Sequence, residues 1–179
     1  MFNIIPTNIA GLSAIEFTLR ADSRGFFVKT MHADAFGEAG IVFDFRESYY
    51  SLSKKNVLRG FHFQTPPADH DKFVYCVDGC VLDVVVDLRR NSQTYGRCEA
   101  RELDGASPSG FIIPKGCGHA FLTLSDRAML VYNVTSVYAP AQDCGVAWNS
   151  VDFDWPISSP LVSDRDRFFP KLVDFKTPF

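Results

Sequence analysis

The pattern of apolar and polar positions along the chain is mostly of the strand type. Short runs rich in Val, Ile, Phe and Tyr are separated by turn residues at irregular spacing, and such runs are typical of β-strands. The pair Asp78-Gly79 lies between two of these runs and accepts the positive φ angles of a tight primed turn. We therefore predict a β-hairpin with strands at residues 73–77 and 80–88.

A second strand pair is predicted at residues 110–113 and 118–124, because two apolar runs flank the turn Pro114-Lys115-Gly116. A further strand is expected at residues 128–135. Helix-type periodicity is scarce in the chain. The pattern as a whole predicts one all-β barrel or sandwich.

Only short pieces of other structure are expected around these strands. Residues 33–39 predict a helical turn, and the tail at residues 155–179, which contains four prolines, is expected to be irregular and packed on the surface. No repeat, low-complexity tract or linker interrupts the chain. We therefore expect a single domain that comprises residues 1–179.

Composition narrows the class of protein. The 179 residues have 46% hydrophobic content and 17 Phe, which suits one compact domain with a substantial core. A formal net charge of -3 gives no overall attraction to nucleic acid. No apolar run approaches the roughly 20 residues that span a bilayer, and the amino terminus lacks the features of a signal peptide. We expect a cytoplasmic protein without nucleic-acid or membrane partners.

The five cysteines are expected to be ordinary thiols. Their number is odd, and the sequence contains neither a CxxC pair nor a combined Cys and His motif of the kind that binds zinc. Buried free thiols are common in proteins of a reducing compartment.

The segment VLRGFHFQ, residues 57–64, carries charged and polar residues in a strand-type run. Inside a strand, Arg59 and His62 must reach water or find partners. Strict alternation would place them on opposite faces, but Gly60 lies between them. A glycine inside a strand often marks a bulge, which redirects the neighbouring side chains. We predict a bulge that turns both residues toward one cavity.

Other strands supply further polar residues that could face the same cavity. Lys72 leads into one predicted strand, while His119 and Tyr132 alternate with apolar neighbours on two others. Each residue alone has an ordinary explanation, such as a hydrogen-bonded core histidine or a packed tyrosine. A barrel lumen that served only packing would be apolar, so the group together predicts a binding or catalytic cavity.

Several long segments, in this order along the chain, closely resemble the dTDP-4-dehydrorhamnose 3,5-epimerase family. They are DSRGFF at 22–27, VLRGFHFQ at 57–64, LDVVVDLRRNSQTYG at 82–96, IPKGCGHAFLTLSD at 113–126 and SDRD at 163–166. The resemblance covers nearly the whole chain. It implies a cupin-type jelly-roll barrel with short peripheral helical turns, usually dimeric, that inverts stereocentres of a nucleotide-linked 4-keto-6-deoxy sugar without metal or redox cofactor.

The reaction of that family explains why such residues are needed. A ketone at carbon 4 acidifies the C–H bonds at carbons 3 and 5, so inversion needs a base, a group that stabilises the oxyanion, and an acid on the opposite face. By resemblance, His62 is the base, and Asp166 orients it and makes it more basic. Tyr132 fits the acid. Lys72 is the candidate for stabilising charge at the keto oxygen.

The resemblance also implies contacts to the nucleotide sugar. Arg59 and His119 suit phosphate or sugar oxygens, and Arg24 resembles a residue that reaches the nucleotide from the neighbouring subunit of a homodimer. Arginine suits this task because it binds phosphate through two parallel hydrogen bonds. The other expected substrate-binding residues are Lys29, Glu47, Tyr49, Gln64, Asp143 and Arg165.

The chain departs from the family where the nucleotide is expected to lie. Glu47-Ser48-Tyr49 replaces the usual Gln-Asp/Glu-Asn, Lys29 replaces an acid, and Val137 replaces an aromatic residue that stacks on thymine in the family. Because the residues of the sugar chemistry are kept, we predict a nucleotide other than dTDP, such as GDP or CDP. Drift within a tolerant dTDP site is the alternative.

One rival hypothesis is a metal-dependent cupin enzyme. Such proteins often bind a transition metal through a His-x-His pair, a downstream acid and a further histidine. Here the corresponding segment reads His62-Phe63-Gln64, and neither His70 nor His119 restores the spacing. One histidine without a carboxylate ligand would be a poor site for such a metal.

A second rival is a catalytically inactive relative that only binds a nucleotide sugar. It would keep Arg24 and Arg59 but would need neither Tyr132 nor Asp166. Both of these residues are present, which favours an enzyme, an isomerase acting on carbohydrates.

Overall fold

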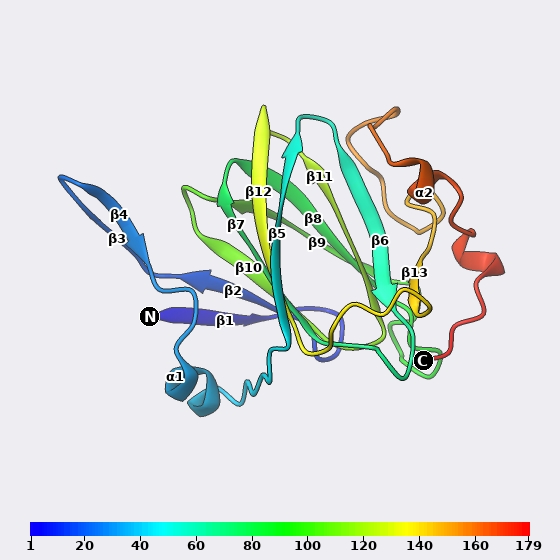
Figure 1. Cartoon of the computed structure of the whole chain (residues 1–179), viewed down its shortest axis with the longest axis horizontal. Helices are drawn as coiled ribbons and strands as arrows, with labels where there is room; N and C mark the ends of the chain where they lie inside the picture. The colour runs from blue at the N-terminus through cyan, green and yellow to red at the C-terminus, as the bar shows by residue number, and fades with distance from the viewer.

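Two antiparallel sheets form the body of the molecule in the computed structural model, which describes residues 1–179 (Figure 1). The larger sheet has six strands in the order β1-β2-β10-β7-β12-β5, and the smaller has five in the order β13-β6-β11-β8-β9. Strands β3 and β4 pair only with each other. This arrangement confirms the prediction of an all-β, cupin-type jelly-roll barrel.

The elements have the following bounds. The strands are β1 (Phe2–Pro6), β2 (Ser13–Phe17), β3 (Leu19–Asp22), β4 (Gly25–Val28), β5 (Glu47–Lys54), β6 (Leu58–Gln64), β7 (Lys72–Asp78), β8 (Cys80–Asp87), β9 (Cys98–Asp104), β10 (Ser109–Ile113), β11 (Cys117–Thr123), β12 (Arg127–Val134) and β13 (Asp143–Gly145). The helices are α1 (Ala33–Glu38), α2 (Asp164–Arg167) and a single 3-10 turn (Leu172–Asp174).

The hydrophobic core divides into three clusters that follow the alternation of the strands. The largest fills the space between the two sheets and includes Val74, Val85 and Phe121. A second cluster lies on the outer face of the smaller sheet, where aromatic residues of the C-terminal tail cover it. A third lies on the outer face of the larger sheet, where Phe36 of α1 packs. Because side chains alternate between faces along a strand, both faces of each sheet are buried in part.

The turn at Asp78-Gly79 forms as predicted, but the predicted hairpin is wrong. Strand β7 pairs with β10 and β12, whereas β8 pairs with β9 and β11. Gly79 has a φ of +74°, and a Cβ there would lie 2.0 Å from the carbonyl oxygen of Arg127. The turn is therefore a corner at which the chain crosses from one sheet to the other, as strands do in packed sheets.

The predicted pairing of residues 110–113 with 118–124 is also wrong, because the chain again crosses from one sheet to the other at the turn between them. These residues form β10 and β11, and β10 belongs to the larger sheet while β11 belongs to the smaller one. Alternation along a strand fixes which residues face the core. It does not specify which sheet the strand joins, because inward-facing residues of both sheets fill the same interior.

The predicted bulge in β6 is confirmed. Strand β11 pairs His119 with His62 and Phe121 with Arg59, so two residues of β6 lie opposite a single residue of β11. Gly60 has a φ of +123°, and a Cβ there would lie 2.5 Å from the Cα of Ala120. Only glycine fits this position, which turns Arg59 and His62 toward the same cavity.

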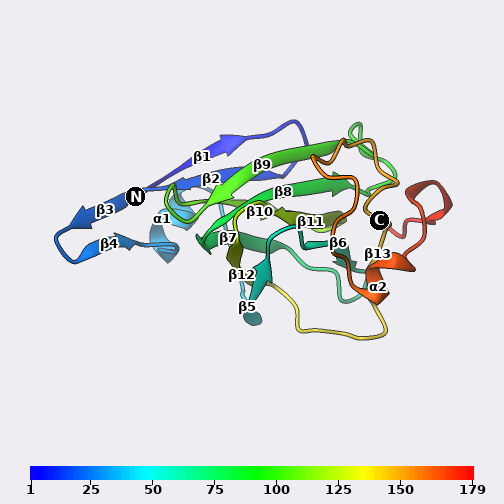
Figure 2. The same ribbon diagram turned by 90° about the horizontal axis from the view of Figure 1, so that it is seen from above.

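The peripheral segments also follow the predictions in outline. Helix α1 lies within the predicted helical turn at residues 33–39. The tail is largely irregular and contains α2 and the 3-10 turn. Figure 2 shows the tail beside β6 and β13, at the end of the molecule opposite the β3–β4 hairpin. None of the helices is both long and apolar enough to cross a bilayer.

Candidate active site

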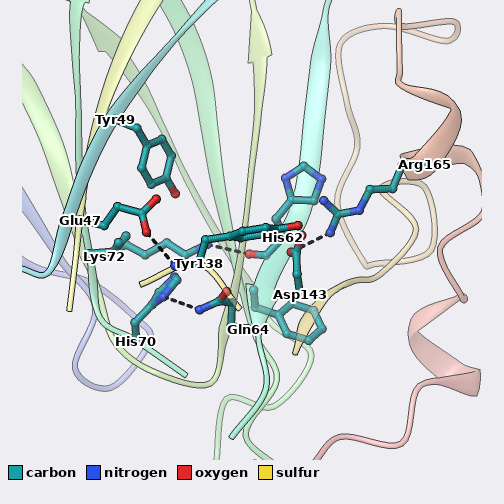
Figure 3. Close-up of a pocket in the computed structure, with 11 residues that line it drawn as sticks. Glu47, Tyr49, His62, Gln64, His70, Lys72, Tyr138, Asp143 and Arg165 are labelled. Atoms are coloured by element: carbon teal, nitrogen blue, oxygen red, sulfur yellow. Dashed lines mark hydrogen bonds and ion pairs between the residues drawn. The ribbon is translucent and has the colours of Figure 1, made fainter. Parts of the chain in front are cut away.

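Two connected cavities open between the sheets, each of about 280 Å³. We name them the inner and the outer chamber. The inner chamber is lined by Tyr49, Ser51, Arg59, His62, Lys72, His119, Phe121 and Tyr132. The outer chamber, drawn in Figure 3, is lined by Glu47, Tyr49, His62, Phe63, Gln64, His70, Lys72, Val134, Tyr138, Asp143 and Arg165. The lumen therefore holds the arginine, lysine, tyrosine and two histidines that the sequence predicted.

His62 is held by a carboxylate from the C-terminal tail. Its Nε2–H donates to Oδ1 of the buried Asp166 at 2.9 Å, and the amide of Gly60 donates to Oδ2 of Asp166 at 3.2 Å. Burial alone would raise the pKa of Asp166, but the hydrogen bond and charge of His62 and the bonds from Gly60 and Ser163 lower it. Asp166 is thus an anion that fixes the imidazole and leaves the lone pair on Nδ1.

A local signal in the sequence places Asp166. Ser163 caps the N-terminus of α2, where its hydroxyl accepts from the amide of Asp166 at 3.1 Å. Serine is among the preferred residues at this position. The cap turns Asp166 inward, so a helix of one turn delivers the carboxylate to the back of His62.

Lys72 lies where the two chambers meet, and its side chain is almost fully buried. Its Nζ donates to the carbonyl oxygen of His62 at 2.9 Å. Burial lowers the pKa of Lys72 to about 8, although the charges of Asp143 and Asp83 oppose this effect. The ammonium group is therefore a desolvated cation whose charge is lost at mildly alkaline pH.

Tyr132 faces the inner chamber from the sheet opposite His62, since β12 belongs to the larger sheet and β6 to the smaller. Its hydroxyl lies 3.1 Å from the Oγ of Ser51. Burial raises the pKa of Tyr132 above its usual range, so the side chain remains a neutral phenol at working pH. The chamber therefore has a potential base on one wall and a potential proton donor on the other.

His119 and Arg59 complete the inner chamber. The Nε2 of His119 lies 2.8 Å and 2.9 Å from the two carboxylate oxygens of the fully buried Asp83. The Nε of Arg59 donates to the Oγ of Ser53 at 3.0 Å. No three or more His, Cys, Asp or Glu side chains gather in a way that could hold a metal ion.

The outer chamber brings together the other polar residues predicted for the substrate. Arg165 forms an ion pair with Asp143 at 2.7 Å, and its guanidinium lies 5.2 Å from the ring centroid of Phe169. Glu47 accepts a hydrogen bond from the amide of Tyr138 at 2.7 Å. These contacts leave Arg165 and Glu47 at the wall of the chamber, where a polar ligand could reach them (Figure 3).

Gln64 is also in the outer chamber, but its amide is engaged within the protein. The Oε1 accepts from the amide of Ala139 at 2.6 Å, and the Nε2 donates to the carbonyl oxygen of Ala68 at 2.9 Å. His70 joins this network through Nδ1, 2.9 Å from the Oγ of Ser136. Burial and the charge of Lys72 lower the pKa of His70 to about 3. Gln64 and the neutral His70 therefore hold the loop between β12 and β13.

Two predicted substrate-binding residues lie outside both chambers. Arg24 is at the tip of the β3–β4 hairpin, where its side chain is 88% exposed and forms an ion pair with Asp22 at 2.6 Å. Lys29 lies next to this hairpin, beside Phe27. The hairpin projects away from the barrel (Figure 1), so this chain does not bring Arg24 or Lys29 to its own chambers.

Several site residues were missed in the sequence. Asp83 could have been found, because an acid in the middle of an apolar strand needs a buried partner. Phe169, which packs edge-on against His62 with ring centroids 5.6 Å apart, carries no local signal. Val137 lines neither chamber, whereas Tyr138 lines the outer one. Val137 replaces an aromatic residue of the family, but the outer chamber still has an aromatic side chain, that of Tyr138.

Comparisons with known proteins agree with this geometry. The family model described as dTDP-4-dehydrorhamnose 3,5-epimerase matches residues 6–174. The dTDP-4-dehydrorhamnose 3,5-epimerase of Shigella flexneri is 38% identical over 175 residues, which are 96% of this chain and 97% of that protein. The dTDP-4-dehydrorhamnose 3-epimerase of Streptomyces niveus is 41% identical over 167 residues, which are 90% of this chain and 80% of that protein.

The fold of this chain also matches a solved structure closely. The dTDP-6-deoxy-D-glucose-3,5-epimerase of Legionella pneumophila, in complex with dTDP-4-keto-L-rhamnose, superposes with a TM-score of 0.93 at 34% identity, and the match covers 98% of this chain and 95% of that one. Sequence and structure both match over nearly their whole length. The chain therefore belongs to the dTDP-4-dehydrorhamnose 3,5-epimerase family.

Proposed function

We propose that this chain is an isomerase that inverts carbon 3, carbon 5 or both in a nucleotide-linked 4-keto-6-deoxy sugar, as a step of deoxysugar biosynthesis. Family membership supports the reaction. The observation that carries the proposal is the position of His62 and Tyr132, which face the inner chamber from opposite sheets with Lys72 between the chambers. Inversion needs proton transfer on two faces of one ring, and this arrangement provides it.

The first step is deprotonation next to the ketone. Nδ1 of His62 takes the proton, the C–H bond breaks, and its electron pair moves to the oxygen on carbon 4. The ammonium of Lys72 stabilises the oxyanion in a site from which most water is excluded, where a fixed charge is most effective. Asp166 stabilises the imidazolium that forms, since it accepts the Nε2–H of His62.

The second step is protonation from the other face. The O–H bond of Tyr132 breaks as a new C–H bond forms on the side opposite His62. The phenolate is strongly basic, because burial raises the pKa of Tyr132, and it takes a proton from water. The imidazolium of His62 releases its proton to water. The product is an isomer of the substrate, so no other reactant is consumed.

The two chambers suggest how the substrate is divided. We place the sugar in the inner chamber with Arg59 and His119, and the diphosphate and nucleoside in the outer chamber with Arg165. We also propose a homodimer in which Arg24 reaches the nucleotide bound to the neighbouring subunit. The five free cysteines favour a reducing, cytoplasmic location. No nucleic-acid or membrane partner is proposed.

The identity of the nucleotide stays a prediction. Val137 lies outside both chambers and Tyr138 supplies an aromatic surface to the outer one, so the valine at position 137 does not speak against stacking on thymine. A nucleotide other than dTDP is favoured by Glu47 and Tyr49, which line that chamber where the family usually has Gln and Asn, and by Lys29, which replaces an acid beside the β3–β4 hairpin.

The test is a time course in deuterium oxide with a panel of nucleotide-linked 4-keto sugars, in which NMR follows product and label separately. We expect label at carbon 3 or 5. His62→Asn should abolish both exchange and epimerisation, since loss of a general base typically lowers the rate about 10²–10⁴-fold. Tyr132→Phe should lose epimerised product but keep exchange with retained configuration, because His62 can return a solvent-derived proton to the original face.

Two matched controls change residues of the same kind outside the site. His32→Asn alters the partly buried cap of α1, where asparagine can also accept a hydrogen bond from a backbone amide, and Tyr50→Phe alters an exposed residue of β5; both should behave as the parent protein. Epimerisation by Tyr132→Phe at the parent rate would refute the assigned roles. Binding without exchange would favour the non-catalytic relative, and activity abolished by a chelator would favour the metal-dependent cupin.

A further inference from the structure

Tyr49 occupies a special position between the chambers. It lines both of them, and only His62 and Lys72 do the same. Its hydroxyl points into the outer chamber (Figure 3). Although 42% of the residue is exposed to solvent, partial burial together with the nearby charges of Glu47 and Asp143 raises the pKa of Tyr49 to about 12. Tyr49 is therefore a neutral phenol that borders both chambers, with its hydroxyl in the outer one.

The ring of Tyr49 packs directly on the proposed proton donor. Tyr49 and Tyr132 are opposite each other in the β5–β12 ladder, and their rings are stacked, with centroids 4.9 Å apart and planes 15° apart. Two residues further along the same face of β5, Ser51 lies 3.1 Å from the hydroxyl of Tyr132. Strand β5 thus contacts both the ring and the hydroxyl of Tyr132.

The other contacts of Tyr132 do not replace this support. The ring of His119 meets it edge-on, with centroids 6.0 Å apart and planes 66° apart. The hydroxyl has one hydrogen-bond partner, Ser51, and the side chain borders an open chamber of about 280 Å³. Without the stacked ring, the phenol would have free volume on the side of the chamber into which it could turn.

We infer that Tyr49 is a positioning residue for Tyr132: its ring holds the phenol in the orientation from which the hydroxyl returns a proton to the sugar. This inference rests on the proposed roles of His62 and Tyr132. Proton transfer demands close alignment, and a misplacement of about 1 Å can lower a rate about 100-fold. Tyr49 would then control how the enolate is partitioned between inversion and return to the starting configuration.

The partition ratio gives a direct test, defined as the rate of deuterium exchange with retained configuration divided by the rate of epimerisation. A general loss of folded or active protein lowers both rates equally and leaves the ratio unchanged. We expect Tyr49→Val, which keeps the strand propensity but removes the ring, to raise the ratio roughly 10- to 100-fold. Exchange itself should stay within about threefold of the parent rate, because His62 is untouched.

A conservative variant separates the ring from its hydroxyl. Tyr49→Phe retains the stacked ring and should keep the parent ratio, although it is expected to raise KM if the hydroxyl contacts the substrate. Tyr50→Val is the matched control, since Tyr50 is the next residue of β5, points to the opposite face and is exposed. It should leave the ratio and both rates unchanged.

Three outcomes would overturn the inference. The first is an unchanged partition ratio in Tyr49→Val, and the second is an equal rise of the ratio in Tyr49→Phe and Tyr49→Val. The third is a parent ratio in Tyr132→Phe, which would refute the proposed role of Tyr132 itself and the role of Tyr49 with it.

Tyr49→Leu replaces the valine variant if that protein fails to fold. The leucine variant also lacks the ring, so the same rise of the partition ratio is expected for it.

Discussion

The charge of Lys72 links the site to pH. Its pKa is lowered to about 8 by burial, and the protonated form is the one that can stabilise an oxyanion. As pH rises through this value, the cation is lost. The exchange rate should therefore fall on the alkaline side of a pH profile, with a midpoint near the pKa of Lys72.

A substitution at Asp143 tests this assignment. The charge of Asp143 raises the pKa of Lys72, so Asp143→Asn should lower that pKa and move the alkaline fall to lower pH. Loss of the ion pair also frees the cation of Arg165, which acts in the same direction. We expect exchange at pH 8 to drop roughly two- to fivefold. Asp126→Asn, at the exposed β11–β12 turn, should leave the profile unchanged, and an alkaline fall that does not move would contradict the assignment.

The bulge in β6 is the element on which the site depends. Strand β6 supplies both Arg59 and His62 to the inner chamber, and Gly60 permits the bend between them. The same residue donates its amide to Asp166. One backbone irregularity therefore orients the proposed base, an arginine proposed to contact the sugar, and the carboxylate behind the base.

Gly60→Ala should disturb stability and activity together. An alanine at positive φ costs about 1–3 kcal/mol, and its Cβ would also lie 2.5 Å from the Cα of Ala120. Gly25→Ala is the matched control, because Gly25 has nearly the same φ of +124° but has no atom within 4 Å of a Cβ. We expect Gly60→Ala to lower the free energy of unfolding further, by about 1–3 kcal/mol of overpacking.

Urea unfolding of the two variants measures this difference, and exchange in deuterium oxide measures the effect on the site. Gly25→Ala should keep the parent exchange rate if the hairpin turn stays folded, whereas Gly60→Ala should lose exchange. Equal destabilisation of both proteins would show that positive φ alone, and not the contact with β11, makes glycine necessary.

At the scale of the whole molecule, the β3–β4 hairpin has no partner within the chain. It pairs with no other strand, and it exposes Phe26 and Phe27 beside Arg24. A two-stranded hairpin is only marginally stable by itself, and neighbouring exposed aromatic residues mark interaction surfaces. Contact with a second copy of the chain would cover these side chains, which supports the proposed homodimer.

Mixing two inactive variants tests this assembly. In a dimer of Arg24→Ala and His62→Asn chains, one site has an intact His62 and receives an intact Arg24 from the other subunit. At equal mixing with free exchange of subunits, about a quarter of the parent activity should return, because half of the dimers are mixed and one of their two sites is intact.

The control mixture combines His62→Asn with Tyr132→Phe. Both residues line the inner chamber of one chain, so no site in a mixed dimer has both intact and no epimerisation should return. Absence of activity in the Arg24 and His62 mixture, despite subunit exchange demonstrated by mass spectrometry, would argue against a shared site.

The local features of this protein could be predicted from its sequence. Strand periodicity indicated an all-β fold, Asp78-Gly79 indicated a tight turn, and Gly60 between Arg59 and His62 indicated a bulge. Each of these depends on a few neighbouring residues, because backbone preferences and the alternation of side chains are local properties. The motifs shared with the family added the set of residues in the lumen, although not their contacts.

Pairing and contact were decided only by the tertiary structure. Whether β8 pairs with β7 or crosses to the other sheet depends on how all strands together fill one interior, and alternation along one strand is the same in both cases. Asp166 meets His62 across 104 positions of sequence, and Tyr49 meets Tyr132 across the β5–β12 ladder. Such contacts depend on the packing of the whole chain. The sequence therefore determined the local structure and the chemical groups of the site, while the tertiary structure decided which groups face each other.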